Sequence, residues 1–272
     1  MSYSYDDLTK RQLTINDSYL MELKKRWFEE RQTLVDYEGF KPIADEWFKS
    51  SKLNNILGWD KFPCIDVIMG CTHFIESLII KHSFDGLQIL KEEYGYFGLQ
   101  GKHGVDPDDL VPNKPLYISL PNWKYCDLRP EWEYLLKICE QRNIDIHIDF
   151  AWITSAKDIT IDIDHPNIQS FCMSLSKYSL QWNRIGLRWS KQRSVDSITM
   201  YNKFYGDVNS ALTSCGAFMM ENIDRDYGWN TYNDKYYEVC KNLNVQPTKM
   251  IHVVKNYETQ EPLGVARILA NM

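Results

Sequence analysis

Residues 167–186 read NIQSFCMSLSKYSLQWNRIG, an apolar run that ends in two serines and a lysine, followed seven positions later by an arginine. The earlier stretch IDIHIDFAW at 144–152 has the same form, because its isoleucines lead to an aspartate. An amphipathic stretch, RPEWEYLLKICEQRN at 129–143, precedes it. Apolar strands that alternate with helices predict an α/β fold with a mainly parallel sheet, which binds ligands beyond the carboxyl ends of its strands.

Neighbouring segments extend this alternation in both directions. A helix is expected at 72–82 and strands at 86–94, 115–120 and 184–190. Residues 1–60 have helical spacing, and helices at 197–220 and 232–243 precede strand-like runs at 249–257 and 264–270. Three regions are therefore predicted: a helical N-terminal segment at 1–60, a large α/β domain at 61–192 and a reduced α+β small domain at 193–272.

Composition excludes several classes of protein. Of the 272 residues, 44% are hydrophobic and 25% are charged, which is typical of a folded chain and not of a disordered one. The net charge of −6 disfavours binding to nucleic acid or to anionic lipid. The seven cysteines lack metal-binding spacing, so no metal is expected. Because we find neither a signal core nor a membrane-spanning run, we expect a cytoplasmic protein.

The strand ends carry the side chains with reactive chemistry. A lysine between hydrophobic strands is desolvated, which lowers its pKa, and a neutral amine at Lys177 attacks carbonyl carbons. Arg184 offers a planar fork for a phosphate dianion, and the hydroxyl of Ser174 adds a further donor. Asp149 ends an apolar strand, where a carboxylate needs a cationic partner to stay ionised. A protonated pyridine nitrogen is such a partner.

Taken together, these stretches resemble the pyridoxal 5′-phosphate (PLP) enzymes of fold type I, in particular the class I/II aminotransferases similar to aspartate and histidinol-phosphate aminotransferases. SLSK followed by RIG resembles the signature in which the lysine, here Lys177, holds PLP as a Schiff base (internal aldimine). By the same resemblance Ser174, Ser176 and Arg184 lie around the phosphate. DFAW at 149–152 resembles the motif whose aspartate, here Asp149, pairs with the pyridinium nitrogen.

The resemblance extends to four shorter segments. MGCTHFIES at 69–77 resembles the glycine turn that binds phosphate in the family, and EEYGYFG at 92–98 resembles the stretch whose first aromatic stacks on the cofactor ring. LPNW at 120–123 resembles the segment whose asparagine binds the cofactor 3-oxygen, and VARILANM at 265–272 resembles the segment whose arginine binds the substrate carboxylate. At the position of Trp152 the family usually has a tyrosine whose hydroxyl lies near the cofactor 3-oxygen. The residues implied are Gly70, Cys71, Thr72, Tyr94, Asn122, Trp152 and Arg267.

The resemblance implies a three-layer α/β/α large domain and a homodimeric aminotransferase in which Lys177 and Asp149 are catalytic. Its substrates would be an amino acid and a 2-oxo acid. Because Trp152 lacks the usual hydroxyl, a PLP-dependent lyase or decarboxylase of the same fold is an alternative. The short chain motivates a third hypothesis, a non-catalytic protein of this fold that binds PLP or regulates a partner.

Two further polar clusters have simpler interpretations. His73 and Glu76 lie about one helical turn apart, but no third ligand is near in sequence, which favours a solvated or cofactor-facing helix start over a metal site. IDIDH at 161–165 also contains metal-ligand types, and we interpret it as a loop before the next strand.

Overall fold

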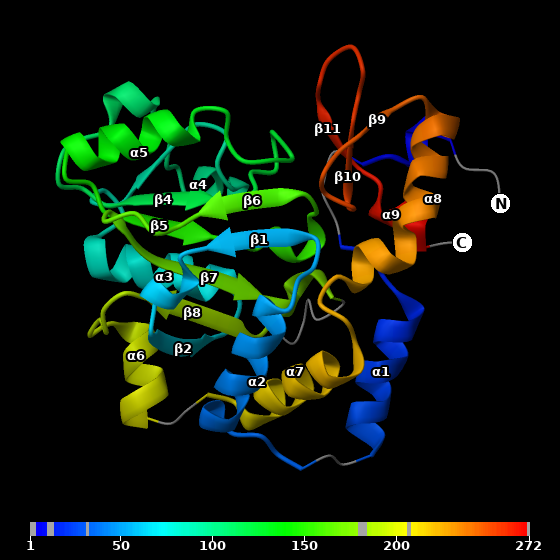
Figure 1. Cartoon of the computed structure of the whole chain (residues 1–272), viewed down its shortest axis with the longest axis horizontal. Coiled ribbons are helices and arrows are strands. Elements are labelled where there is room, and N and C mark those ends of the chain that lie inside the picture. Colours follow the sequence, from blue (N-terminus) through cyan, green and yellow to red (C-terminus); the bar gives the residue numbers. More distant parts are fainter. Residues whose placement is uncertain (1–3, 10–13, 31–32, 179–183, 206–207, 271–272) are drawn as a thin grey trace.

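The computed structural model describes residues 4–9, 14–30, 33–178, 184–205 and 208–270, and a six-stranded sheet forms its centre (Figure 1). The strands follow the order β2-β8-β7-β5-β4-β3. They are β2 (Cys64–Ile68), β3 (Gln88–Ile89), β4 (Leu116–Ser119), β5 (Ile146–Asp149), β7 (Ile168–Ser174) and β8 (Gly186–Ser190). From β3 to β7 the pairing is parallel, whereas β8 is antiparallel to both neighbours. The predicted mainly parallel sheet is confirmed.

Helices cover both faces of this sheet. The helices packed with it are α1 (Ser18–Glu29), α2 (Tyr37–Lys49), α3 (Cys71–His82), α5 (Trp132–Gln141), α6 (Ser197–Met200) and α7 (Ser210–Asn222). Successive residues of β7 belong to different buried clusters: Phe171 and Met173 pack with α2 and α5, whereas Cys172 packs with α3. Because side chains alternate across a strand, the two clusters lie on opposite faces, which gives the three-layer α/β/α arrangement.

Some predicted elements differ in length. The expected strand at 86–94 is only β3, and the expected helix at 197–220 is divided into α6, a π-helical turn at Tyr201–Tyr205 and α7. Short helices also interrupt the connections. They are α4 (Gly95–Leu99) and the 3₁₀ turns η1 (Tyr5–Asp7), η2 (Trp59–Lys61), η3 (Pro107–Asp109), η4 (Ile153–Ser155) and η5 (Leu175–Lys177).

A two-stranded parallel sheet corrects two expectations. β1 (Asn54–Leu57) lies in the segment expected to be helical, and it pairs with β6 (Ile159–Asp162). Asp162 therefore ends a strand and does not lie in a loop. The side chains of β6 alternate between buried and exposed, with Ile159 and Ile161 inside, which is the pattern of a half-buried strand.

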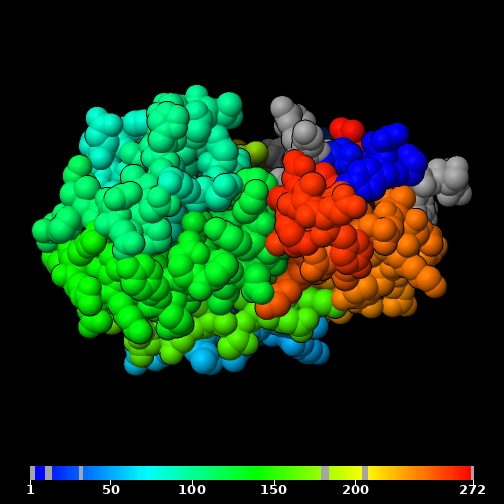
Figure 2. Space-filling model, turned by 90° about the horizontal axis from the view of Figure 1, so that it is seen from above, coloured from blue at the N-terminus to red at the C-terminus, as the bar shows by residue number. Residues whose placement is uncertain are grey.

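The C-terminal unit forms a separate body beside the sheet, coloured orange to red in Figure 2. It contains α8 (Tyr227–Leu243), the antiparallel strands β9 (Gln246–Pro247), β10 (Val253–Lys255) and β11 (Pro262–Gly264), and α9 (Ala266–Ala270). The predicted strand at 264–270 is wrong, because the strand ends at Gly264 and a helix follows. Ala266, Ile268 and Leu269 are buried while Arg267 is exposed, so the helical turn covers the apolar side chains.

The N-terminal helices belong to the large core. Leu20 of α1, Phe40 of α2 and Cys215 of α7 are buried in one cluster with the sheet, whereas Ile15 packs with the C-terminal unit. Residues 1–60 were expected to contribute to the small domain. Leu8 and Leu53 also pack against the C-terminal unit, so residues of the N-terminal segment contact both bodies. The boundaries at residues 60 and 192 stay predictions. No helix in the ranges given above is both long and apolar enough to cross a membrane.

Candidate functional site

Most of the predicted site residues, Arg267 excepted, come together at one edge of the central sheet, because several strands end there. β4, β5 and β7 are parallel, so their carboxyl ends share that edge. β2 runs in the same direction, since β8 is antiparallel to both β2 and β7. Asn122, Trp152, Lys177 and the start of α3 each follow one of these four strands. This edge is where an α/β sheet binds its ligands.

Lys177 lies in the turn after β7 and is half-buried. Its Nζ lies 3.5 Å from the ring centroid of Trp152. Burial lowers the pKa of the Lys177 amine to about 8, although the neighbouring Cys71 and Asp149 act in the opposite direction. Within the described ranges no hydrogen bond or salt bridge binds this amine. About a tenth of the Lys177 amine is therefore neutral and nucleophilic at pH 7, far more than for an ordinary lysine.

Asp149 is the last residue of β5 and is 4% exposed. Its Oδ2 accepts a hydrogen bond of 2.8 Å from the hydroxyl of Tyr117, and its Oδ1 accepts one of 2.7 Å from the N–H of Ala151. Burial raises the pKa of this carboxyl despite both donors. A cation that binds beside Asp149 would reverse this shift, because an opposite charge favours the ionised form.

The start of α3 forms an anion cradle. Gly70 precedes the helix at a positive φ of 80°, and no side chain caps the first N–H groups. A Cβ on Gly70 would lie 3.1 Å from Cβ of Arg184, so glycine lets the arginine approach closely. Nη1 of Arg184 donates to Oγ1 of Thr72 at 3.3 Å, and Sγ of Cys71 lies 3.4 Å from Oγ of Ser174. Amide donors, hydroxyls and a guanidinium at a helix N-terminus suit a phosphate group.

Register explains why these distant segments meet. Gly186, the first residue of β8, lies between Ile68 of β2 and Ser174 of β7. Arg184 is thereby placed between the start of α3 and the end of β7. A Cβ on Gly186 would lie 2.0 Å from the carbonyl oxygen of Met173, so no larger residue fits.

Two buried thiols lie next to Asp149. Cys172 faces Asp149 in the sheet register, and its Sγ lies 3.7 Å from Oδ1 of that residue. Ligand atoms of Cys71, Cys172 and Asp149 all lie within 4.8 Å of one another, so these three residues could together bind a metal ion. The spacing of the cysteines along the sequence does not reveal this cluster. Burial raises the pKa of the Cys172 thiol well above its usual range. Protonated thiols are weak ligands, so the pair is a poor metal site unless a metal displaces both protons.

Other predicted residues lie around this edge with less direct support. Asn122 is buried, its Nδ2 donates to the carbonyl of Glu92 at 3.0 Å, and its Oδ1 accepts from the N–H of Lys124 at 2.8 Å. Oγ of Ser176 lies 3.1 Å from Oγ of Ser174. Tyr94 is 44% exposed and its ring stacks on Tyr96. Their roles toward a cofactor stay predictions.

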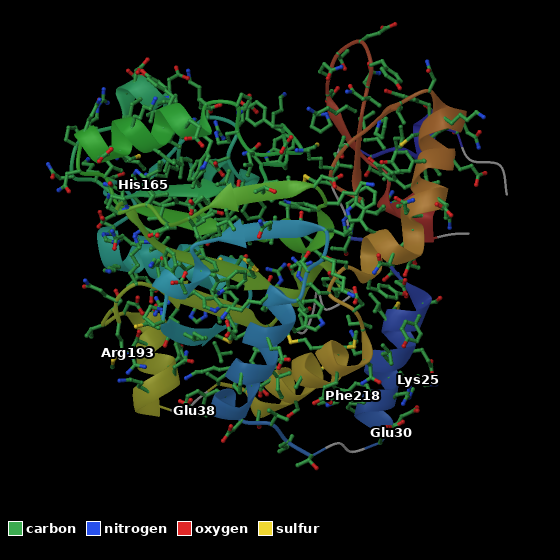
Figure 3. All side chains as sticks on the ribbon, viewed as in Figure 1. Lys25, Glu30, Glu38, His165, Arg193 and Phe218 are labelled. Atoms are coloured by element: carbon green, nitrogen blue, oxygen red, sulfur yellow. The ribbon has the colours of Figure 1, made fainter. Side chains whose placement is uncertain are left out.

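Arg267 lies on α9 with an exposed side chain, and no hydrogen bond or ion pair in the described residues joins it to the Lys177 edge. Its role toward the substrate carboxylate also stays a prediction. His73 accepts from the N–H of Met69 through Nδ1 at 3.3 Å, which agrees with the helix-start interpretation. His165 lies at the end of the sheet remote from the C-terminal unit (Figure 3).

Three residues at this edge were not singled out from the sequence. A tyrosine in a fully buried strand needs a partner for its hydroxyl, and this signal points to Tyr117. No sequence pattern points to Cys172, because its position next to Asp149 follows only from the pairing of β5 with β7. His252 packs its ring 5.7 Å from that of Trp152 and belongs to the C-terminal unit, so no local pattern links it to Lys177.

Comparison with known proteins gives matches at the level of structure only. No family model and no curated sequence matches the chain. A PLP-bound C–S lyase from Staphylococcus hominis superposes with a TM-score of 0.59 at 12% identity over 93% of this chain and 76% of that one. An aspartate aminotransferase variant from Thermus thermophilus gives 0.59 at 11% identity over 89% and 74%. The tyrosine aminotransferase from Leishmania infantum gives 0.57 at 11% identity over 89% and 78%.

These likenesses cover most of each chain. Identities of 11–12% establish the architecture and not the reaction. The chain has the fold of the PLP-dependent aminotransferases and C–S lyases, that is, fold type I.

Proposed function

We propose that this chain binds PLP and is an aminotransferase that acts on an amino acid or a related amine. One observation carries the proposal: an amine of lowered pKa, a buried carboxylate and an anion cradle meet at one sheet edge, from β7, β5 and α3. PLP presents an aldehyde, a basic ring nitrogen and a phosphate. The three features fit these three groups in kind and in number.

Each residue has a stated task. Lys177 would hold the cofactor covalently, Asp149 would lie beside the ring nitrogen, and Ser174, Thr72 and Arg184 would hold the phosphate with the first N–H groups of α3. When bound, PLP supplies an electron-withdrawing ring that stabilises negative charge at the substrate α-carbon. Asp149 keeps its negative charge in a dry site, where it favours a proton on the ring nitrogen.

Lys177 also has a task in proton transfer. The Lys177 amine would move a proton from the substrate α-carbon to the C4′ position of the cofactor in transamination. An amine with a pKa of about 8 accepts and releases protons readily near neutral pH. The face of Trp152 next to Nζ favours the ammonium form between these steps, because a cation over an aromatic ring is stabilised.

The covalent attachment has a direct test. PLP-loaded protein is reduced with borohydride, digested and analysed by mass spectrometry, and we expect the added mass on the peptide that contains Lys177. The Lys177→Ala protein should lose both this adduct and the visible absorbance of lysine-bound PLP. Lys241→Ala, which changes an exposed lysine of α8, is the matched control and should keep both. An unchanged spectrum of Lys177→Ala would refute the assignment.

A lyase or decarboxylase is the second candidate, and one observation favours it. Trp152 presents its ring and no hydroxyl to Lys177, and the amino-acid enzymes of this fold include a C–S lyase. Product formation from amino acids is measured with and without 2-oxoglutarate or pyruvate. Dependence on the 2-oxo acid supports transamination, whereas product that ignores it supports the lyase. If PLP binds but no product forms under either condition, the chain is the non-catalytic binding protein instead.

We further propose a homodimer, as the resemblance to the aminotransferases implies. The large apolar side chains of Met69, Ile80, Tyr94 and Leu99 are exposed, and a dimer interface would remove such side chains from water. Light scattering coupled to gel filtration measures the mass directly. A monomeric mass at micromolar concentration contradicts the dimer.

A further inference from the structure

A narrow cavity lies beside Lys177, between the large sheet and the C-terminal unit. Its polar lining comes from four separate segments: Asp17 before α1, Thr154 in η4, Tyr227 and Tyr232 in α8, and His252 before β10. Lys177 forms part of the same wall. A group in this cavity would therefore contact the nucleophilic amine on one side and the C-terminal unit on the other.

Two residues of the lining have polar atoms without a partner. Oγ1 of Thr154 and both ring nitrogens of His252 are buried, and none makes a hydrogen bond within the described part of the chain. The side chains of these residues are only 3% and 2% exposed. Buried polar atoms are nearly always paired, because leaving one unpaired costs about 1–3 kcal/mol. These atoms are therefore able to hydrogen-bond a polar group that enters the cavity.

The remaining lining residues offer acceptors. The hydroxyls of Tyr227 and Tyr232 both donate to Oδ2 of Asp17, the first at 2.9 Å, so their own oxygens are left to accept. Oδ1 of Asp17 accepts from the N–H of Leu20 at 2.8 Å. Among the described residues no salt bridge gives Asp17 a cationic partner. This part of the lining thus carries the carboxyl group of Asp17 and is rich in acceptor oxygens.

His252 adds an acceptor nitrogen to this wall. Burial lowers the pKa of its imidazole to about 3, and the charge of Lys177 acts in the same direction. The ring is therefore neutral at physiological pH, with one nitrogen that accepts and one that donates.

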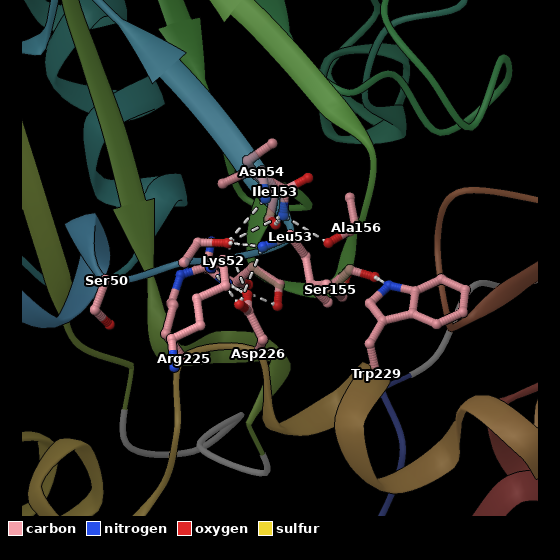
Figure 4. A network of polar contacts seen from close by, with 12 residues as sticks. Ser50, Lys52, Leu53, Asn54, Ile153, Ser155, Ala156, Arg225, Asp226 and Trp229 are labelled. Carbon is pink, nitrogen blue, oxygen red and sulfur yellow. Dashed lines mark hydrogen bonds and ion pairs between the residues drawn. The ribbon is translucent and has the colours of Figure 1, made fainter.

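Neighbouring contacts hold the cavity wall in place (Figure 4). The carbonyl of Ser155 accepts from Nε1 of Trp229 and from the N–H of Ile251, each at 3.0 Å. Nη1 of Arg225 donates to the carbonyl of Thr154 at 3.1 Å, and Asp226 accepts from the N–H of Lys52 at 2.6 Å. These bonds join η4, α8 and the segment before β1. The unpartnered atoms therefore lie on a fixed surface and not on a loop that could turn them toward water.

We propose that this cavity binds the distal amine of the substrate, so that the enzyme acts on diamino acids or diamines, with Thr154 and His252 as specificity-determining residues. The inference rests on the proposed function. An ammonium group donates three hydrogen bonds and carries positive charge, and it would donate to Oγ1 of Thr154, to the acceptor nitrogen of His252 and to a tyrosine oxygen beside Asp17. A distal carboxylate would face Asp17 and lose these bonds, because like charges repel.

The test compares amino acids that differ only in the distal amine. PLP-loaded protein is titrated by calorimetry with L-lysine and L-ornithine, and with L-norleucine, L-norvaline and L-glutamate. We expect each diamino acid to bind at least about 10-fold more tightly than its apolar counterpart, which corresponds to one or two charge-assisted hydrogen bonds. Equal affinity for the apolar counterpart, or tighter binding of L-glutamate, overturns the proposal.

Two nearly isosteric variants locate the effect. Thr154→Val and His252→Phe remove the polar atoms and keep most of the volume, and each should reduce the preference for L-lysine over L-norleucine about 5- to 10-fold. Thr160→Val, on the exposed face of β6, is the control and should leave the preference unchanged. An unchanged preference in both cavity variants overturns the assignment to this cavity.

The results of these experiments also distinguish failure of this inference from failure of the proposed function. If the wild-type protein forms no borohydride-reducible adduct with PLP, the proposed function fails and this inference fails with it. If the adduct forms on Lys177 while the preference for a distal amine is absent, only the cavity inference fails. Circular dichroism of each variant verifies that the protein is folded, and the wild-type preference is decisive even where a variant does not fold.

Discussion

Asp66 and Asp149 lie at the two ends of one row of side chains that crosses four strands of the sheet. The register places Asp149, Cys172, Arg188 and Asp66 next to one another on β5, β7, β8 and β2. Asp66 contacts Nη2 of Arg188 at 2.5 Å, and Asp196 contacts Nη1 of the same residue at 2.5 Å. Among the described residues Asp149 accepts from uncharged donors, which include the hydroxyl of Tyr117, the N–H of Ala151 and the thiol of Cys172.

The two ends differ in how their charges are compensated. Burial alone would lower the pKa of Arg188, but the contacting Asp196 and Asp66 carboxylates raise it. Burial would likewise raise the pKa of Asp196, and Arg188 lowers it. At the other end burial prevails, since the pKa of Asp149 is raised and that of Lys177 is lowered. One end stabilises charge within the fold, whereas the other leaves two groups able to respond to a ligand.

The largest expected effect separates these roles at Asp149. We expect Asp149→Asn to lower kcat/KM of the PLP-loaded protein by about 10³-fold, because an amide cannot hold a proton on the ring nitrogen. The free energy of unfolding of the PLP-free protein should change by less than about 1 kcal/mol, since without PLP no salt bridge in the described residues pairs the buried Asp149 carboxylate with a cation. Steady-state kinetics and urea unfolding measure the two quantities. A large loss of stability with unchanged kcat/KM would show that Asp149 has a structural role and not a catalytic one.

The opposite outcome is expected at the paired end of the row. Arg188→Met leaves Asp66 and Asp196 buried without their cation, which should lower the free energy of unfolding by about 3–5 kcal/mol. Adding Asp66→Asn and Asp196→Asn to this variant should recover a substantial part of the loss. Urea unfolding of the single and triple variants is the measurement, and a loss below about 1 kcal/mol in Arg188→Met would contradict a structural role.

A smaller effect is expected in the anion cradle. Arg184→Gln should weaken PLP binding about 10- to 100-fold through loss of a charge-assisted contact with the phosphate. Pyridoxal, which lacks the phosphate, is the matched ligand, and its affinity should not change. Equal weakening of both ligands would show that Arg184 does not bind the phosphate.

The smallest effect is the pH dependence of Lys177. The PLP-free protein should capture PLP at a rate that rises about tenfold per pH unit below about 8 and becomes constant above it, because only the deprotonated amine attacks. The sign follows from the lowered pKa, since raising the pH through 8 removes the proton. Stopped-flow absorbance across pH 6 to about 10 measures this profile. A rate that is still rising near pH 10 would indicate an ordinary, solvated lysine.

Local pattern was enough to predict much of the fold. β-branched runs such as Ile144–Ile148 and amphipathic runs such as that around Leu135 predicted strands and helices, because burial imposes their periods directly on the sequence. The predicted strand at 264–270 was wrong, because the short apolar run at Ala266–Ala270 is compatible with both a strand and a helical turn. Only the packing of Ile268 and Leu269 against α8 decided between them.

The same division applies to the candidate site. Local sequence pattern was enough to single out Lys177, Asp149 and the turn at Gly70 as site candidates, because each lies at the end of a strand or helix that the pattern predicts. Tertiary structure alone decided that Cys172 faces Asp149, that Tyr117 donates to it and that His252 reaches the cavity beside Lys177. Strand register and the docking of the C-terminal unit set these contacts, and both depend on residues too far apart along the chain for any local period to encode.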